Sequence, residues 1–94
     1  MSNKKLTYEQ QRVYDLLKSR NEYYTNNELS LFTGYDSRTI RQIIQSLRLK
    51  HIPIASNNNG YILDKNETKI TIAIMNAHIK TLIQTRNALQ KSIK

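Results

Sequence analysis

The feature that constrains this chain most is a short turn around Gly34, between two amphipathic helical segments. The run TNNE at positions 25–28 is a capping box, which predicts where the first of these helices begins. Gly34 can supply the positive φ of a tight turn, and Asp36 or Ser37 can cap the helix that follows. Two helices joined by so short a turn around a glycine predict a helix-turn-helix.

The helix after this turn is predicted from about Ser37 to Lys50. Its apolar residues follow the 3.6-residue period and form one stripe, which predicts a buried face; they are Ile40, Ile43, Ile44 and Leu47. A further helix is predicted from a second capping box, TYEQ at positions 7–10, to about Ser19. Tyr23–Thr25 could form a very short strand before the helix pair.

After the second helix of the pair, the pattern changes from helix to hairpin. Residues 52–56 and 61–63 predict two strands, and NNNG at positions 57–60 predicts the turn between them. Asn-Gly between apolar runs is a strong hairpin signal, because both residues tolerate the positive φ of a type I′ turn. A hairpin directly after the third helix is the wing of a winged helix-turn-helix.

The C-terminal segment has no glycine or proline from Glu67 onward, which predicts one long helix of about 40 Å. One face carries a heptad seam with a single polar interruption at Arg86. We expect the start of this helix to pack on its own domain through Ile70 and Ile74, while the seam pairs with a second copy. The alternative is that the whole helix folds back on the monomer. The residues assigned to dimerisation are Ile72, Met75, Ile79, Leu82 and Leu89.

The predicted fold class is therefore mainly α with a small β-hairpin. Residues 1–64 form a winged helix-turn-helix domain, and residues 65–94 form an amphipathic helix that follows it.

Charge is distributed unevenly along this basic chain, which has 15 Lys and Arg, 7 Asp and Glu, and a net charge of +8. Residues 7–35 contain three basic and four acidic side chains. Residues 36–51 contain four basic side chains against Asp36, and residues 65–94 contain six against Glu67. Local concentration of positive charge favours a polyanionic partner, and nucleic acid is preferred here to a membrane surface. The alternative is a general solubilising bias.

The region around the turn resembles a known family. The residues that carry the likeness are TGYDSRTIR at 33–41, then Ile44, Leu47, Arg48, Pro53, Ile54, Ser56 and GYIL at 60–63. Together they resemble the winged helix-turn-helix of the biotin-operon-repressor N-terminal type, which many small phage and plasmid proteins also carry. The resemblance covers about Leu6 to Leu63 and implies DNA binding through the third helix and the wing. It departs at His51, where the family usually has a glycine that ends the helix.

The third helix also has a polar face that suits the major groove. Arg38, Gln42 and Gln45 point away from the apolar stripe, and arginine can pair with guanine while glutamine can pair with adenine. Ser37 and Thr39 would lie near phosphate at the helix N-terminus. The residues predicted to contact DNA are Ser37, Arg38, Thr39, Arg41, Gln42, Gln45 and Arg48 in the helix, with Asn58 and Asn59 in the wing. The alternatives are an ordinary solvated face and asparagines that only form a turn.

No catalysis, cofactor, metal site or small-molecule ligand is predicted. The chain has no cysteine, its histidines His51 and His78 are far apart, and it has no Gly-rich phosphate loop. The first residues, MSNKK, do not resemble a signal peptide, and no apolar run is long enough to span a membrane. We therefore expect a cytoplasmic protein without enzymatic activity.

The most favoured function is that of a sequence-specific double-stranded DNA-binding protein, a small transcriptional regulator of phage or mobile-element type, acting as a homodimer. The alternative is a winged-helix interaction protein that binds and inhibits a host protein. A weaker third hypothesis is single-stranded nucleic-acid binding, which only the six tyrosines suggest.

Overall fold

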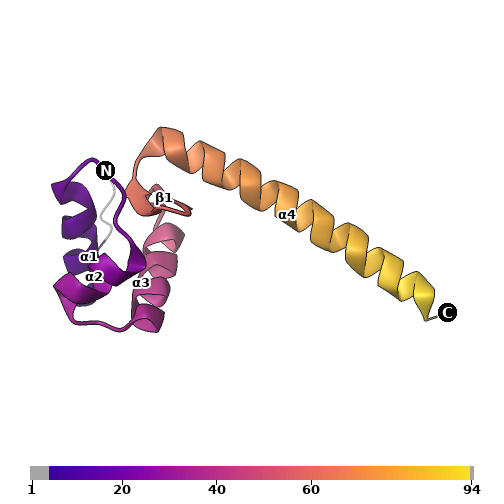
Figure 1. The fold of residues 1–94 in the computed structure, drawn as a ribbon, viewed down its shortest axis with the longest axis horizontal. Coiled ribbons are helices and arrows are strands. Elements are labelled where there is room, and N and C mark those ends of the chain that lie inside the picture. Colours follow the sequence, from indigo (N-terminus) through magenta and orange to yellow (C-terminus); the bar gives the residue numbers. More distant parts are fainter. Residues whose placement is uncertain (1–4, 94) are drawn as a thin grey trace.

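The computed structural model describes residues 5–93, which fold into four helices and one hairpin. In chain order these are α1 (Tyr8–Ser19), α2 (Asn26–Thr33), α3 (Ser37–Leu49), β1 (Ile54–Asn57), β2 (Gly60–Leu63) and α4 (Lys65–Ser92). The first five elements pack into one body, here called the head, and α4 projects away from it (Figure 1). The mainly helical fold with a small hairpin and a long C-terminal helix is as predicted. The predicted domains also include residues 1–4 and 94, which lie outside the described residues.

Each of the four helices begins with a side chain that accepts a hydrogen bond from the amide three residues later. Both predicted capping boxes form, with the Thr7 and Thr25 hydroxyls each 3.0–3.1 Å from the amide that donates to them. Such caps satisfy amides that a helix cannot pair internally. Because cap and partner are only three residues apart, these starting points are determined locally. The four capping residues are Thr7, Thr25, Asp36 and Asp64.

The ends of α2 and α3 both use a residue with positive φ. Gly34 has φ 81° after α2, as predicted. His51 has φ 67° after α3, where its amide donates to the Arg48 carbonyl (2.9 Å) and the Ile52 amide donates to the Leu47 carbonyl (3.2 Å). These two bonds form a Schellman motif, which normally has glycine at this position. Histidine therefore ends α3 in a conformation that glycine usually adopts.

The core of the head lies between α1, α2, α3 and β1. The apolar stripe predicted for α3 is buried, and α1 contributes Val13 and Leu17 from the facing side. Leu29 of α2 and Ile54 of β1 close the ends of this core. Packing this stripe inward forces the opposite face of α3 into solvent.

Tyr24 joins the wing to the helices. Its amide donates to the Tyr61 carbonyl (2.8 Å), and the Tyr61 amide donates back to the Tyr24 carbonyl (2.7 Å). The short strand expected around Tyr24 is thus a single bridge to β2. Gly60 lies against this bridge, and a Cβ atom there would lie 2.1 Å from the Tyr24 carbonyl oxygen. Only glycine permits so close an approach of the two backbones.

The turn of the wing differs from the predicted one. Asn57, the last residue of β1, pairs with Gly60, the first residue of β2, so the loop contains only Asn58 and Asn59. Among the described residues His51 is the only non-glycine with positive φ, so the type I′ geometry expected at Asn59 is wrong. The physical reason is local, since the Asn57 side chain accepts from the Asn59 amide (2.7 Å) and folds the loop itself.

The contact between α4 and the head also differs from the prediction. Ile70 and Ile74 are 56% and 61% exposed, so the expectation that they pack on the head is wrong. The buried residue is Thr71, 7% exposed, whose hydroxyl contacts the Ser56 amide nitrogen (3.2 Å) and carbonyl oxygen (3.3 Å) of β1. The outer edge of β1 presents polar backbone, which a small hydroxyl side chain satisfies and an isoleucine cannot.

Beyond Thr71 the helix leaves the head completely. Every residue from 72 to 93 is exposed, and α4 extends as a straight rod (Figure 1). The alternative in which α4 folds back on its own domain is therefore wrong. Nearer the head, a second contact holds the base of α4, since the Tyr23 hydroxyl donates to the Glu67 carboxylate (2.6 Å). That bond raises the pKa of the Tyr23 phenol.

The two glycines provide a matched test of the Tyr24 bridge. Gly34→Ala meets open space and adds only the strain of a left-handed residue, so we expect a loss of about 1 kcal/mol in the free energy of unfolding. Gly60→Ala also forces the wing away from Tyr24, and we expect a loss of at least about 2 kcal/mol. Urea unfolding followed by circular dichroism measures both. Equal losses would contradict the close approach at Gly60.

Candidate nucleic-acid interface

The outward face of α3 carries four exposed polar side chains that lie together. Arg38, Arg41, Gln42 and Gln45 line one shallow hollow, with Leu49 at its end. None of these four polar side chains forms a hydrogen bond or ion pair with another residue of 5–93. The structure thus brings together four of the residues predicted to contact DNA. Their hydrogen-bond donors are open to solvent.

Arg48 lies on the flank of α3 and is committed to the wing. Its Nε donates to the Ile54 carbonyl (3.0 Å), and its Nη2 donates to the Ser56 hydroxyl (3.0 Å). Burial lowers the pKa of this guanidinium, but arginine stays charged at neutral pH. Arg48 therefore fixes the wing against α3, a structural task that the sequence did not reveal.

The opposite flank of α3 is held by α1. The Gln10 side chain donates to the Ser46 hydroxyl (2.8 Å), and its oxygen accepts from Lys50 (2.7 Å). Lys50 also donates to the Lys5 carbonyl (2.6 Å). The end of α3 is thus held on both sides by hydrogen bonds, on one flank to the wing and on the other to α1.

The start of α3 offers less to an anion than predicted. The Thr39 amide donates to the Asp36 carboxylate (2.8 Å) and is therefore not open to phosphate. That bond, with the nearby charges of Arg38 and Arg41, lowers the pKa of Asp36. A negative charge therefore stands at this helix start. Ser37 and Thr39 are half-buried beside it.

A second hollow lies between the start of α2 and the wing. It brings the predicted residues Arg48 and Asn58 beside Asn26 and Asn57, which sequence reasoning missed. The positive end of the α2 dipole points to this region, and its first amides lack partners within the helix. The only signal in the sequence was the polar run at the start of α2, which the capping box already explained. Asn59 lies exposed beside this hollow at the wing tip.

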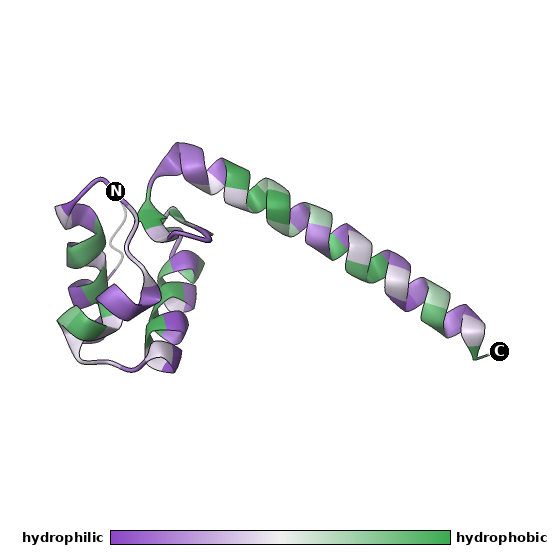
Figure 2. Ribbon diagram, viewed as in Figure 1, coloured by the Kyte–Doolittle hydropathy of each residue, from purple (hydrophilic) through white to green (hydrophobic). Residues whose placement is uncertain are grey.

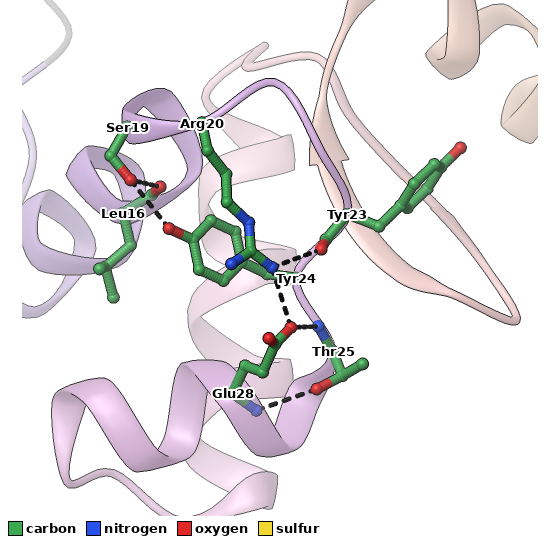
Figure 3. Close-up of polar contacts among 7 residues, drawn as sticks. All are labelled: Leu16, Ser19, Arg20, Tyr23, Tyr24, Thr25 and Glu28. Atoms are coloured by element: carbon green, nitrogen blue, oxygen red, sulfur yellow. Dashed lines mark hydrogen bonds and ion pairs between the residues drawn. The ribbon is translucent and has the colours of Figure 1, made fainter.

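Polar contacts hold the junction between α1 and α2, which leads into the start of α2 (Figure 3). The Arg20 guanidinium stacks on the Tyr24 ring, 3.7 Å from its centroid, and donates to the Tyr23 carbonyl (2.7 Å) and to Glu28 (3.0 Å). The Tyr24 hydroxyl is 2.8 Å from the Ser19 hydroxyl at the end of α1. The bond from the Thr25 amide and the charge of Arg20 lower the pKa of Glu28. Arg20 thereby ties the end of one helix to the start of the next.

No protein-family model, curated protein or solved structure matches this chain. Over residues 5–93, no helix is long and apolar enough to cross a membrane. In the same range, no three His, Cys, Asp or Glu side chains are grouped so that they could hold a metal ion.

The cap of α3 predicts how stability depends on pH. Because the pKa of Asp36 is lower in the folded state than in the unfolded chain, its stabilising effect is present above an unfolded value of about 3.9 and is lost as pH falls through the folded value. We expect Asp36→Asn to reduce the acid sensitivity of Tm, since asparagine caps helices without a charge. Thermal unfolding between pH 6 and pH 3 measures this. Glu28 remains in the variant, so part of the acid dependence should persist. Unchanged acid dependence would contradict the assignment.

Proposed function

We propose that the protein binds double-stranded DNA in a sequence-specific manner, as a small transcriptional regulator of phage or mobile-element type acting in the cytoplasm. The observation that carries this proposal is the face of α3 on which two arginines and two glutamines are exposed without partners. The resemblance to winged helix-turn-helix domains of the biotin-operon-repressor type supports the same function.

In this proposal α3 enters the major groove, which is wide enough to admit a helix. Arg38 and Arg41 donate to guanine O6 and N7, and Gln42 and Gln45 pair with adenine N6 and N7. These side chains are available because the head uses none of them for its own hydrogen bonds. The protein therefore has base-reading chemistry on the helix whose outward face is open to solvent.

The hollow between α2 and the wing receives the phosphate backbone. Arg48 supplies positive charge there, while its bonds to Ile54 and Ser56 hold the wing in place. Asn57 and Asn58 offer side-chain amides to phosphate oxygens, while the Asn26 amide already donates to the Ser37 carbonyl (3.4 Å). The wing itself has no charged residue from 52 to 63, so its contribution is hydrogen bonding and shape.

Inhibition of a host protein is the second candidate, because several apolar side chains of the head are exposed. Leu49, at the end of the α3 hollow, is 71% exposed, and Leu31 of α2 is 80% exposed. Such side chains cost little singly on a surface. This function would require a protein partner that covers α3 and competes with DNA for it.

Binding to duplex DNA should weaken steeply as salt is raised, because neutralising each phosphate releases counterions. We expect the double variant Arg38→Ala/Arg41→Ala to weaken binding to random duplex and to flatten the salt dependence, because it removes two positive charges from the helix that lies in the groove. The matched control is Lys18→Ala/Lys91→Ala, which removes the same charge outside the proposed interface. Fluorescence anisotropy on a random duplex gives the slopes. Absence of binding at low salt would contradict the proposal and favour the host-protein candidate.

Gln42 separates base reading from general attraction. After selection of a preferred site, Gln42→Ala should reduce discrimination between that site and random duplex by roughly 1–3 kcal/mol, because alanine cannot form the two hydrogen bonds to adenine. The variant carries the same charge as the parent protein, so its salt slope should be unchanged. If site preference survives in Gln42→Ala, α3 does not read bases through this face.

A further inference from the structure

The apolar seam of α4 lies entirely in water. Its residues are spread along the rod, where Figure 2 shows hydrophobic positions recurring along its length, well beyond the head. The five seam residues Ile72, Met75, Ile79, Leu82 and Leu89 are each 42–63% exposed. A contiguous apolar stripe of this length is rare on a protein that functions as a monomer. The seam therefore requires a partner.

A second copy of α4 fits the seam better than an unrelated surface. The seam repeats at spacings of three and four residues, so an identical helix presents the same knobs and holes. The positions that flank the seam between 72 and 93 have no lysine, arginine, aspartate or glutamate. Two copies can therefore approach without like-charge contacts at these positions. The flanking residues are Asn76, His78, Ile83, Thr85, Gln90 and Ser92.

The charged residue within the seam, Arg86, favours one orientation of the two helices. The outer half of α4 carries Lys80, Arg86 and Lys91 without any acidic residue, whereas the base has two acidic residues, Asp64 and Glu67, and two basic ones, Lys65 and Lys69. Parallel helices would place basic residues level with each other and would stack Arg86 on its own copy at a core position. Antiparallel helices instead place each Arg86 opposite an uncharged residue of the other copy, well separated from the second Arg86.

We propose that α4 pairs in antiparallel orientation with α4 of a second copy of the chain. The register that uses the whole seam places Ile79 opposite Leu82 of the second copy, and Ile72 opposite Leu89. Arg86 then lies opposite Met75, whose flexible thioether can adapt to the arginine stem. The two Thr71 positions are separated by about 28 Å along the rod, so the heads stand at opposite ends of the pair.

Single cysteines test this orientation, because the chain has none of its own. The full-length variants Ile72→Cys and Leu89→Cys are oxidised separately and as a mixture. In the proposed register only the mixture brings two thiols together, so cross-linked heterodimer should form more than about tenfold faster than either homodimer. Rapid homodimer formation by Ile72→Cys alone would show parallel pairing and overturn the proposal.

Light scattering on the unmodified protein tests association itself, and we expect a dimer at tens of micromolar. Leu82→Glu/Leu89→Glu should give a folded monomer, whereas the matched control Ile70→Glu/Ile74→Glu changes equally exposed residues outside the seam and should remain dimeric. A monomeric unmodified protein, or a control as monomeric as the seam variant, overturns the proposal. Neither measurement involves DNA, so this inference and the proposed function can fail separately.

Discussion

The backbone bridge between Tyr24 and Tyr61 is the constraint on which the arrangement of the head depends, because it is where the helices and the wing meet. The side chain of Tyr24 meanwhile reaches the end of α1 through Ser19 and lies under the Arg20 guanidinium. Tyr24 thus connects the end of α1 with β2, two parts of the head that are separated in the sequence. The absence of a side chain at Gly60 is what allows the two backbones to meet.

From this bridge the geometry of the proposed DNA surface follows. The bridge places β2 beside the start of α2, and Arg48 then holds β1 against α3. The second hollow, between the start of α2 and the wing, lies between the Tyr24–Tyr61 bridge and the Arg48 contacts. The face of α3 that we propose reads bases is determined separately, since burying Ile40 and Ile44 turns Arg38 and Gln42 outward independently of the wing. The proposed base contacts therefore depend on the packing of α3, and the proposed backbone contacts depend on the attachment of the wing.

Sequence reasoning succeeded where the deciding interaction is local. Thr25 and Glu28 are three residues apart, and the spacing of Ile40 and Ile44 determines which face of α3 is buried, so both could be predicted. It failed where a partner comes from elsewhere in the chain. Nothing near Arg48 indicates that Ile54 and Ser56 will take its donors. Likewise Thr71 packs on β1 because an edge strand has backbone amide and carbonyl groups without strand partners. A prediction based on hydrophobic periodicity does not include such polar contacts.

The attachment of α4 has a mechanical consequence. Glu67 and Thr71 hold the helix near its base, and about 30 Å of rigid rod extends beyond Thr71. The rod is therefore a lever whose pivot lies on β1, a strand of the wing. A tilt of about 10° at that pivot moves the far end by about 5 Å, comparable to one turn of helix. A small displacement of the wing therefore produces a larger displacement at the tip of α4. A force applied to the tip is likewise transmitted to the wing.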